Sequence, residues 1–424
     1  MDDSRQVRAP ALTPQVLTAK EAEERLTLLR KYPTAMDLRA RARKLMPNFA
    51  FEYMDGGAGI DGGIKRNWAA LDAVELVPRY GKVIAPPPAD TMLFGRRYSA
   101  PIGIAPIGGP GTAFPGAETY LAKAAQAARV PYTLGVLSGI TVEDAAKIAP
   151  DVLWYQLYRF SNNDHKIGMD LVDRAQRSGV HVLVLTIDTP ARTIRSREVK
   201  SGIVNPFKLT MRLRLDAMTS PHWLAALAKN GIPRFVSLNP YMPDNTSLED
   251  SAAFVRREQG GAFTWEEVEK YRARWKGPLV LKGVLHPADA EKAVSLGVDG
   301  LFVTNHGGRQ IEALPTSIDA LPAIKAAVGN KATLILDSGI RSGIDAARAI
   351  ACGADAAFAG KSFLWSLGAL GPKGPGHLIN LYTDDVRAAL GQLGCKTVEE
   401  LHAVSVRHPG AWKREDFGTS TSRL

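Results

Sequence analysis

The stretch Thr304-Asn305-His306-Gly307-Gly308-Arg309-Gln310 indicates where this chain carries its chemistry. It follows an apolar run, residues 300–303, that predicts a buried strand. The two glycines after His306 end the strand and allow the backbone to pass close to a bulky neighbour. His306 and Arg309 therefore stand three residues apart on one strand-ending loop, where both side chains can reach the same small ligand.

The two side chains have complementary chemistry. Imidazole has the unperturbed pKa nearest neutrality, so His306 can accept a proton at working pH. The planar guanidinium of Arg309 fits a carboxylate. A base beside a carboxylate clamp suits the deprotonation of a 2-hydroxy acid. In isolation the same residues are also compatible with a plain turn that has a surface histidine and a solvated arginine. A choice between an active site and a plain turn therefore depends on the rest of the chain.

Seven further apolar, β-branched segments recur along the chain with helical patterns between them. With residues 300–304 they give eight predicted strands, the others being 101–105, 132–134, 153–157, 182–186, 279–282, 333–337 and 356–359. The helical patterns include residues 118–128, 164–177, 287–296 and 343–351. Eight strands that alternate with helices predict an α/β fold, a (β/α)8 TIM barrel. Such barrels place their active sites on the loops that follow the strands.

Segments outside this alternation complete the predicted domain organisation. Residues 1–30 form a polar N-terminal arm, and residues 31–424 form the barrel domain. Residues 34–54 predict helices before the first strand, and residues 378–393 and 397–404 predict two helices after the last. The gap after the fourth strand spans about 70 residues, where ~2–6 usually connect a strand to a helix. Residues 189–262 are therefore a predicted insertion, a loop or lid.

The first half of this insertion combines cations with large apolar side chains. Between residues 191 and 235 its only carboxylates are Glu198 and Asp216, while Phe207 and Trp223 are among the apolar residues. One interpretation is a lid that packs on its own barrel or on a neighbouring subunit. The other is peripheral contact with an anionic membrane, with Phe207 and Trp223 at the interface. The cations are Arg192, Arg195, Arg197, Lys200, Lys208, Arg212, Arg214, Lys229 and Arg234.

Composition narrows the class of protein. The chain has 424 residues, of which 45% are hydrophobic and 23% charged, as in ordinary soluble globular proteins. No apolar run is long enough to span a membrane, and the first residues lack the features of a signal peptide. Cys352 and Cys395 form neither a disulfide framework nor a metal site, so we expect a cytoplasmic protein without a metal. The net charge of +10 favours anionic partners, but it is the only feature that favours nucleic acid, and we expect none.

Two glycine-rich turns follow the last two predicted strands. Asp337-Ser338-Gly339-Ile340-Arg341 follows the seventh strand, and Ala359-Gly360-Lys361 follows the eighth. Each turn opens a predicted helix, and backbone N–H groups at helix N-termini favour phosphate. Barrels frequently hold phosphate with the loops after strands seven and eight. The pair therefore predicts a phosphorylated substrate or a phosphate-bearing cofactor.

Ordered motifs over residues 34–405 resemble the FMN-dependent 2-hydroxy-acid oxidases and dehydrogenases, a family that includes glycolate oxidase, lactate oxidase, and lactate and mandelate dehydrogenases. The resemblance implies FMN, and oxidation of a small (S)-2-hydroxy acid to the 2-oxo acid. Electrons would pass to oxygen, a quinone or a protein carrier. We also expect a homo-oligomer, a tetramer. Besides the stretches quoted above, the motifs are Phe51-Glu52-Tyr53, Ala105-Pro106-Ile107-Gly108, Tyr155-Gln156-Leu157-Tyr158, Thr186-Ile187-Asp188-Thr189-Pro190 and Val280-Leu281-Lys282-Gly283.

The resemblance implies a role for each catalytic residue. His306 would be the base and Asp188 its partner, which fixes the ring tautomer and stabilises imidazolium. Arg309 and Tyr53 would hold the substrate carboxylate so that the α-carbon lies in a reactive pose. Tyr158 would hydrogen-bond the substrate.

The resemblance also implies a second active-site arginine and a set of contacts with FMN. Arg195 matches the arginine, although Arg192 and Arg197 compete for that role. Lys282 would face flavin N1 and O2, where a fixed cation stabilises the charge of the reduced ring. The remaining implied contacts are Pro106, Ile107, Gly108, Gly135, Gln156, Thr186 and Thr304 at the flavin, and Asp337, Gly339, Arg341, Gly360 and Lys361 at the phosphate.

Departures from the family pattern bear on substrate and acceptor. Leu137 stands in place of a tryptophan of glycolate oxidase, which predicts a pocket for acids larger than glycolate. Gly108 is shared with the dehydrogenase and monooxygenase branches, and Ser220-Pro221-His222-Trp223 resembles the membrane-associated branch. A peripheral position on the cytoplasmic face of the membrane, near a quinone, is therefore a further expectation. The alternatives are a related flavin barrel enzyme, such as an isomerase or peptide-modifying oxidase, and a non-enzymatic flavin- or phosphate-binding module.

Overall fold

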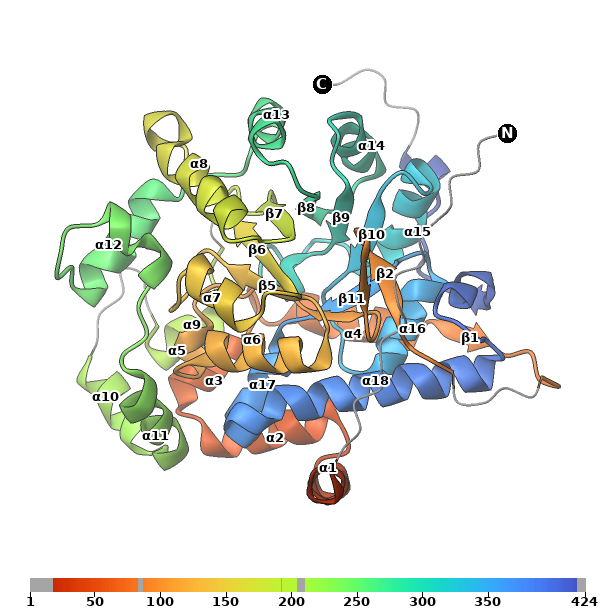
Figure 1. Cartoon of the computed structure of the whole chain (residues 1–424), viewed down its shortest axis with the longest axis horizontal. Coiled ribbons are helices and arrows are strands. Elements are labelled where there is room, and N and C mark those ends of the chain that lie inside the picture. The colour runs from red at the N-terminus through yellow and green to blue at the C-terminus, as the bar shows by residue number, and fades with distance from the viewer. Residues whose placement is uncertain (1–17, 83–86, 192, 204–209, 418–424) are drawn as a thin grey trace.

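The computed structural model describes residues 18–82, 87–191, 193–203 and 210–417 (Figure 1). Eight parallel strands close into a barrel in chain order, so the predicted (β/α)8 TIM barrel is confirmed. Every predicted strand is present, within two residues at either end. The strands are β4 (Ile102–Ile104), β5 (Tyr132–Gly135), β6 (Leu153–Leu157), β7 (Val182–Thr186), β8 (Leu279–Val284), β9 (Gly300–Val303), β10 (Thr333–Leu336) and β11 (Ala356–Ala359).

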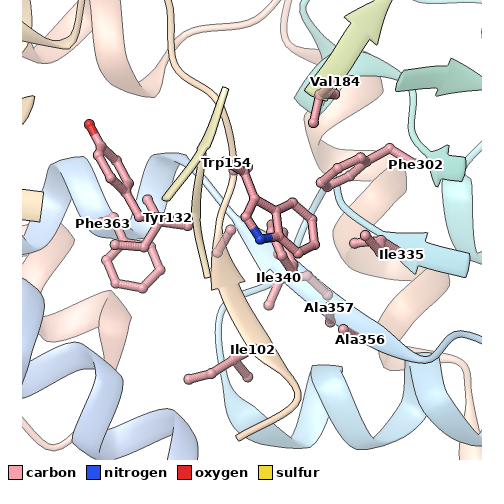
Figure 2. Close-up of a cluster of buried hydrophobic side chains, with 14 of the residues drawn as sticks. Ile102, Tyr132, Trp154, Val184, Phe302, Ile335, Ile340, Ala356, Ala357 and Phe363 are labelled. Atoms are coloured by element: carbon pink, nitrogen blue, oxygen red, sulfur yellow. The ribbon is translucent and has the colours of Figure 1, made fainter. Parts of the chain in front are cut away.

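The strands are nearly continuous apolar runs because both of their faces are buried, one in the barrel interior and one beneath the helices. Trp154 and Phe302 lie in the barrel interior (Figure 2), and each packs against Phe358 with ring centroids 5.1 Å apart. A Cβ atom on Gly103 would lie 2.4 Å from the Phe358 ring, so glycine at this position makes room for it. The interior is thus a packed core and not a channel.

The helices that cover the barrel follow the strands as predicted. A short hairpin of β2 (Thr91–Leu93) and β3 (Arg96–Tyr98) precedes the first barrel strand, and its Phe94 and Tyr98 pack against Trp154. This closes the amino-terminal end of the barrel and leaves the opposite end for the site. The covering helices are α6 (Ala117–Ala128), α7 (Val142–Ile148), α8 (Asn162–Arg177), α13 (Trp265–Arg274), α14 (Pro287–Ser295), α15 (Ser317–Val328), α16 (Gly343–Ala351) and α17 (Lys361–Leu370).

Both ends of the chain add helices outside the barrel. Pro47 divides the predicted helical segment 34–54 into α2 (Ala35–Leu45) and α3 (Asn48–Asp55). The helix predicted for residues 397–404 is wrong. Only a 3₁₀ turn, η4 (Glu399–Ala403), forms there, because the chain then extends into β12 (Ser405–Arg407), which pairs with β1 (Glu75–Val77). The other terminal helices are α1 (Ala19–Lys31), α4 (Gly62–Asp72) and α18 (Gly374–Leu393).

The insertion after β7 folds into short helices at the left of Figure 1, and the first three of them lie beside α2 and α3. They are α9 (Ser196–Ser201), α10 (Met211–Met218), α11 (Pro221–Asn230), η1 (Val236–Tyr241) and α12 (Leu248–Glu258), and α5 (Pro110–Ala113) lies close to them.

The expected place of Trp223 at a membrane interface is wrong. Trp223 is 6% exposed, donates from Nε1 to the Ala113 carbonyl oxygen at 2.9 Å and packs against Phe49. Phe207, the other expected anchor, lies outside the described residues. None of the described helices is both long and apolar enough to cross a bilayer.

Candidate active site

A cavity of about 940 Å³ lies at the carboxyl ends of the barrel strands, beneath the insertion. Its walls come from β8 and from the loops after the other seven barrel strands, from α3 to α5 and the first turns of α6 and α17, and from α10 to α12. The predicted site residues that line it are Tyr53, Pro106, Ile107, Gly108, Tyr158, Arg195, Lys282, His306, Arg309, Asp337, Gly339, Gly360 and Lys361. Segments more than 300 residues apart in sequence therefore meet in one site.

His306 is held by its backbone and by Asp188. Its φ of 60° is left-handed, and Gly307 and Gly308 continue this conformation at 67° and 72°, so the chain turns sharply away from β9. The ring Nδ1 lies 3.0 and 3.1 Å from the two carboxylate oxygens of Asp188. The Gln310 side chain donates to the Asp188 carbonyl oxygen at 2.6 Å, which holds the backbone that carries the carboxylate. Nε2 is therefore the ring nitrogen left to meet a ligand.

Electrostatics keep this pair ready for proton transfer. Burial lowers the pKa of His306 and Lys282 adds to this effect, while Asp188 opposes it. Burial alone would raise the pKa of Asp188, but His306 and Lys282 outweigh it and the pKa is lowered. A neutral imidazole beside an ionised carboxylate can accept a proton near neutral pH and stabilise the resulting imidazolium.

Arg309 is fixed by acceptors from two segments. Nη1 donates to the carbonyl oxygens of Tyr53 at 2.9 Å and Gly56 at 3.1 Å, and Nη2 donates to Glu198 Oε1 at 2.6 Å. Arg195 reaches the same Glu198 oxygen from Nη1 at 3.3 Å. Sequence reasoning gave Glu198 no role in the site. Its only signal was its place as one of two carboxylates in a strongly basic stretch.

Two tyrosines add neutral donors to the cavity. The Tyr53 hydroxyl donates to the Gly108 carbonyl oxygen, and its ring lies beneath the Arg309 guanidinium, 5.4 Å from centroid to Cζ. Burial raises the pKa of Tyr53 and of Tyr158, so both hydroxyls stay protonated. Tyr158 can therefore donate to an anionic ligand, and Tyr53 can do so in exchange for its hydrogen bond to Gly108.

Lys282 places a buried positive charge in the cavity floor. Its Nζ lies 3.6 Å from Asp337 Oδ2. Burial alone would lower the pKa of Lys282, but Asp337 and Asp188 outweigh it and the pKa is raised. The Thr304 hydroxyl donates to the other Asp337 oxygen. The lysine therefore stays charged, as a group that meets developing negative charge must.

The far end of the cavity suits a phosphate. Lys361 begins α17 beside Gly360 and Gly339, and its Nζ donates to the Gly56 carbonyl oxygen at 2.6 Å. Burial lowers the pKa of Lys361 well below its ordinary value, and Arg309 adds to this effect. An anion bound there would favour the charged form of Lys361. Lys361 and the N-terminus of α17 fit the phosphate of FMN, while Lys282 and the wall at Ile107 and Gly108 fit its ring.

A family model described as FMN-dependent dehydrogenase matches residues 42–408. The chain belongs to this family. Among solved structures, a monotopic membrane protein, (S)-mandelate dehydrogenase, superposes with a TM-score of 0.83 at 29% identity, covering 88% of this chain and 99% of its own. A mandelate oxidase with benzoyl-formic acid has a TM-score of 0.75 at 31% identity, covering 89% and 99%. The protein is thus an FMN-dependent 2-hydroxy-acid oxidoreductase.

Six of the residues implied by the resemblance do not line the cavity of this FMN-dependent dehydrogenase. Gln156 donates to the Thr186 hydroxyl at 2.8 Å, which joins β6 to β7 behind the wall. A Cβ atom on Gly135 would lie 2.8 Å from the Ile107 carbonyl oxygen, so any side chain at this position would crowd the loop. The six are Gly135, Gln156, Thr186, Asp188, Thr304 and Arg341.

Arg341 is the residue that departs most from its expected place. Its guanidinium pairs with Asp72 at 2.7 Å and Asp345 at 3.4 Å, and it lies over the Trp68 ring. Its neighbours Ser338, Gly339 and Ile340 do line the cavity. At this end of the cavity, residues 338–340 and Lys361 therefore line the wall, and Arg341 does not. Within the described residues, no cluster of His, Cys, Asp and Glu could hold a metal ion.

Proposed function

We propose that this enzyme oxidises an (S)-2-hydroxy acid with an apolar side chain, of mandelate type, to the corresponding 2-oxo acid. One observation carries the proposal: His306, held by Asp188 behind it, shares a cavity with the Arg309 and Tyr53 donors. A base and a carboxylate-binding group are the two elements that recognition and deprotonation of a 2-hydroxy acid require. Bound FMN supplies the acceptor for the electron pair that leaves the substrate.

The residues of the cavity have different roles in this reaction. Arg309, Arg195 and the Tyr53 hydroxyl bind the substrate carboxylate and so orient the α-carbon. His306 accepts a proton from the substrate at Nε2, and Asp188 stabilises the imidazolium that results. Lys282 holds a positive charge at the ring side of the cavity, where it favours the reduced cofactor.

Side-chain specificity follows from an apolar part of the cavity wall. Leu137 and Tyr158 lie near Gly108, where an added Cβ atom would be 3.9 Å from Leu137 Cδ1 and 3.8 Å from the Tyr158 hydroxyl. Leu227 and Phe235 of the insertion extend the apolar lining. An apolar lining favours an apolar guest. The mandelate dehydrogenase and mandelate oxidase neighbours support the same size class.

Anaerobic mixing with a panel of hydroxy acids tests the proposal. Bleaching of the flavin absorbance reports reduction directly, without a choice of electron acceptor. We expect (S)-mandelate and longer-chain (S)-acids to reduce the flavin with a higher ratio of rate to Kd than glycolate, and the (R)-acids to be poor substrates. Bleaching by none of them contradicts the proposed reaction, and a preference for glycolate contradicts the proposed pocket.

We further propose that the enzyme binds an anionic membrane through α10 and passes its electrons to a quinone there. Met211, Leu215 and Met218 are 66%, 57% and 68% exposed, and their spacing puts them on one face of the helix. Exposed cations of the same segment are Lys200, Arg212, Arg214, Lys229 and Arg234. Each cation that reaches an anionic surface contributes about 1 kcal/mol. The monotopic membrane neighbour supports this arrangement.

Co-sedimentation with vesicles tests this second proposal. We expect the protein to pellet with vesicles in proportion to their anionic lipid content, and to be released by salt. Met211→Ser with Met218→Ser should abolish binding while substrate still bleaches the flavin. The matched control is Val77→Ser with Met92→Ser, two exposed apolar residues on β1 and β2, on the other side of the molecule (Figure 1). Wild type that stays in the supernatant at low salt contradicts the proposal.

A further inference from the structure

Glu198 is a buried carboxylate between the two arginines of the cavity. It is 3% exposed, and Oε1 lies 2.6 Å from Arg309 Nη2 and 3.3 Å from Arg195 Nη1. Both arginines line the cavity, whereas Glu198 does not. Arg195 also donates from Nε to the Arg309 carbonyl oxygen at 3.3 Å, so the two arginine segments are joined twice.

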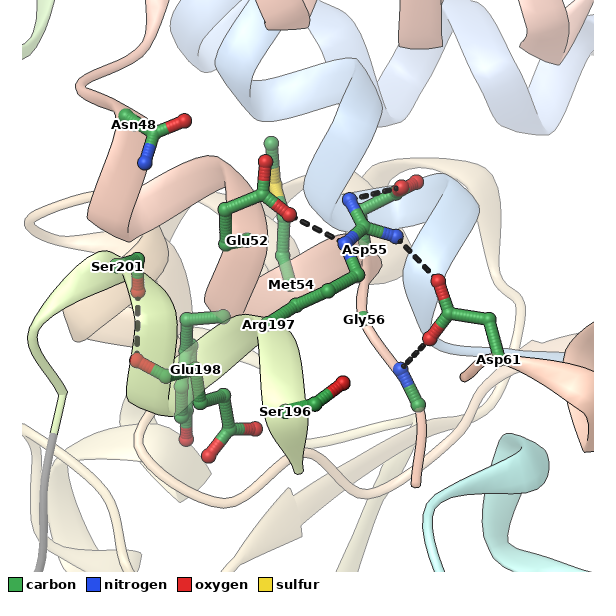
Figure 3. A network of polar contacts seen from close by, with 12 residues as sticks. Asn48, Glu52, Met54, Asp55, Gly56, Asp61, Ser196, Arg197, Glu198 and Ser201 are labelled. Carbon is green, nitrogen blue, oxygen red and sulfur yellow. Dashed lines mark hydrogen bonds and ion pairs between the residues drawn. The ribbon is translucent and has the colours of Figure 1, made fainter. Parts of the chain in front are cut away.

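The segment that carries Glu198 is anchored independently of the cavity. Figure 3 shows Arg197, the preceding residue, surrounded by Glu52, Asp55 and Asp61. Arg197 donates to Asp55 and Asp61 at 2.8 Å each, and also to Glu52. Because these carboxylates belong to α3 and to the turn before α4, α9 cannot slide along the barrel without breaking a charged network.

The backbone at the start of α9 is held as well. The Gly59 N–H donates to the Ile194 carbonyl oxygen at 3.2 Å, and the Ser196 hydroxyl donates to the Gly59 carbonyl oxygen. Gly59 and Arg195 form an isolated parallel bridge. These contacts fix α9 on both sides of Arg195, so the position of Glu198 is set before any ligand arrives.

A fixed carboxylate at this position offsets the repulsion between the two arginine side chains. Two guanidinium groups that share a buried site repel each other, and a buried charge without a partner is costly. Burial and Arg195 both lower the pKa of Arg309, while Glu198 opposes them. Among the described residues, these two cations and one carboxylate leave a single positive charge, which one substrate carboxylate can balance.

The hydrogen bonds of Arg309 show how orientation follows. A guanidinium has five N–H donors, and three of them are used by Tyr53, Gly56 and Glu198. Acceptors on two separate segments define the plane of the group. Within the described residues, two donors then remain for a ligand in the cavity.

We infer that Glu198 is a positioning residue, which holds Arg309 and Arg195 together as one carboxylate-binding unit. The inference rests on the proposed function for its ligand, a 2-hydroxy or 2-oxo acid. A carboxylate at this place has one other role open to it, that of a competitor which occupies the arginines in place of the substrate. The two roles differ in sign: removal of a positioning residue weakens carboxylate binding, and removal of a competitor strengthens it.

Glu198→Gln in the FMN-loaded enzyme separates the two roles. Titration with benzoylformate, a 2-oxo acid, measures carboxylate binding by calorimetry without turnover. We expect its Kd to rise roughly 10- to 100-fold, the range for loss of a hydrogen bond to a charged group. The KM for (S)-mandelate should rise with it, while kcat changes less. Glu198→Asp, which restores the charge on a shorter side chain, should recover part of the affinity.

Controls keep the outcome unambiguous. Asp244→Asn removes one negative charge from an exposed position of the same insertion and should leave the Kd unchanged. A lower or unchanged Kd in Glu198→Gln, with FMN retained and Tm near that of wild type, overturns the inference. If the glutamine variant fails to fold, Glu198→Asp decides, since an affinity equal to or above that of wild type is then the overturning result. Wild type that binds benzoylformate but is reduced by no hydroxy acid refutes the proposed reaction alone.

Discussion

The backbone turn at His306 and the contact of its side chain with Asp188 together fix the orientation of the imidazole ring. A left-handed conformation costs a non-glycine residue roughly 1–2 kcal/mol, and such strain concentrates at functional sites. Here the φ of 60° is followed by two glycines that adopt the same region without that cost. The Thr304 hydroxyl accepts from the His306 backbone N–H at 3.0 Å, which holds the turn in place. The histidine is thus aimed by its loop and then fixed in rotation by Asp188.

The lowered pKa of His306 predicts where activity is lost with pH. A base must be neutral, so the rate of flavin reduction rises with pH through the pKa of His306 and is constant above it. Burial lowers that pKa below 6.5, so we expect the midpoint of the acidic limb to lie below pH 6.5. Asp188→Asn removes the group that raises the pKa, and should shift the limb further down while the rate falls. Stopped-flow reduction across pH measures both, and an upward shift in the variant contradicts this assignment.

A substitution of Leu137 tests the predicted size of the pocket for the substrate side chain. Tryptophan at this position would fill apolar volume beside Gly108 and Tyr158. We expect Leu137→Trp to lower kcat/KM for (S)-mandelate by about 10-fold or more, as overpacking of ~1–3 kcal/mol implies, and to affect glycolate less. Steady-state kinetics on both acids decide it. An equal loss for both substrates means that Leu137 does not contact the side chain.

At the scale of the element, the insertion has two faces with different tasks. Leu213 and Trp223 are buried toward the barrel, while Met211, Leu215 and Met218 are exposed. The sequence predicted the mixture of cations and apolar residues, but not which apolar residues face out. A short helix in an insertion has no strand on either side to set its orientation. The membrane interpretation of this mixture places Trp223 outward, whereas its indole N–H donates to the Ala113 carbonyl oxygen within the protein.

The two faces predict different consequences of mutation. Trp223→Ala removes a buried indole and its contact with Phe49, and should destabilise the protein by roughly 3–5 kcal/mol. Met211→Ser should leave the free energy of unfolding nearly unchanged, because its side chain is already exposed. Thermal or urea denaturation of the two variants measures the contrast. Comparable loss in both would mean that α10 packs against the molecule through its outer face.

Across the whole molecule, the sequence predicted the fold better than it predicted the side chains that meet in the site. The strands were found because they are buried on both faces and therefore read as continuous apolar runs. The helix predicted for residues 397–404 is wrong because the chain extends there into β12. The residues around Val406 pair with β1, which lies more than 300 residues away in sequence. Glu198 and Arg341 gained their partners through the same kind of long-range contact, with Arg309 and Asp72.

We expect Lys361 to contribute to the retention of FMN by the folded protein. Its amine lies at the start of α17 in a buried site that lowers its pKa, and an anionic phosphate bound there would favour the charged form. Lys361→Ala should weaken FMN retention by at least about 10-fold, as loss of a charge-assisted contact implies. The ratio of bound flavin to protein after dialysis measures this. Arg341→Ala is the matched comparison, and a larger loss there would mean that its guanidinium turns toward the phosphate.

Single-turnover reduction of the flavin in His306→Ala tests the central claim most directly. The variant is loaded with FMN and mixed anaerobically with saturating (S)-mandelate beside wild type, so that neither the acceptor nor the membrane affects the result. We expect FMN to remain bound and its reduction to slow by ~10²–10⁴-fold, the range for loss of a positioned general base. Reduction at a rate near that of wild type would contradict the assignment of His306 as the base.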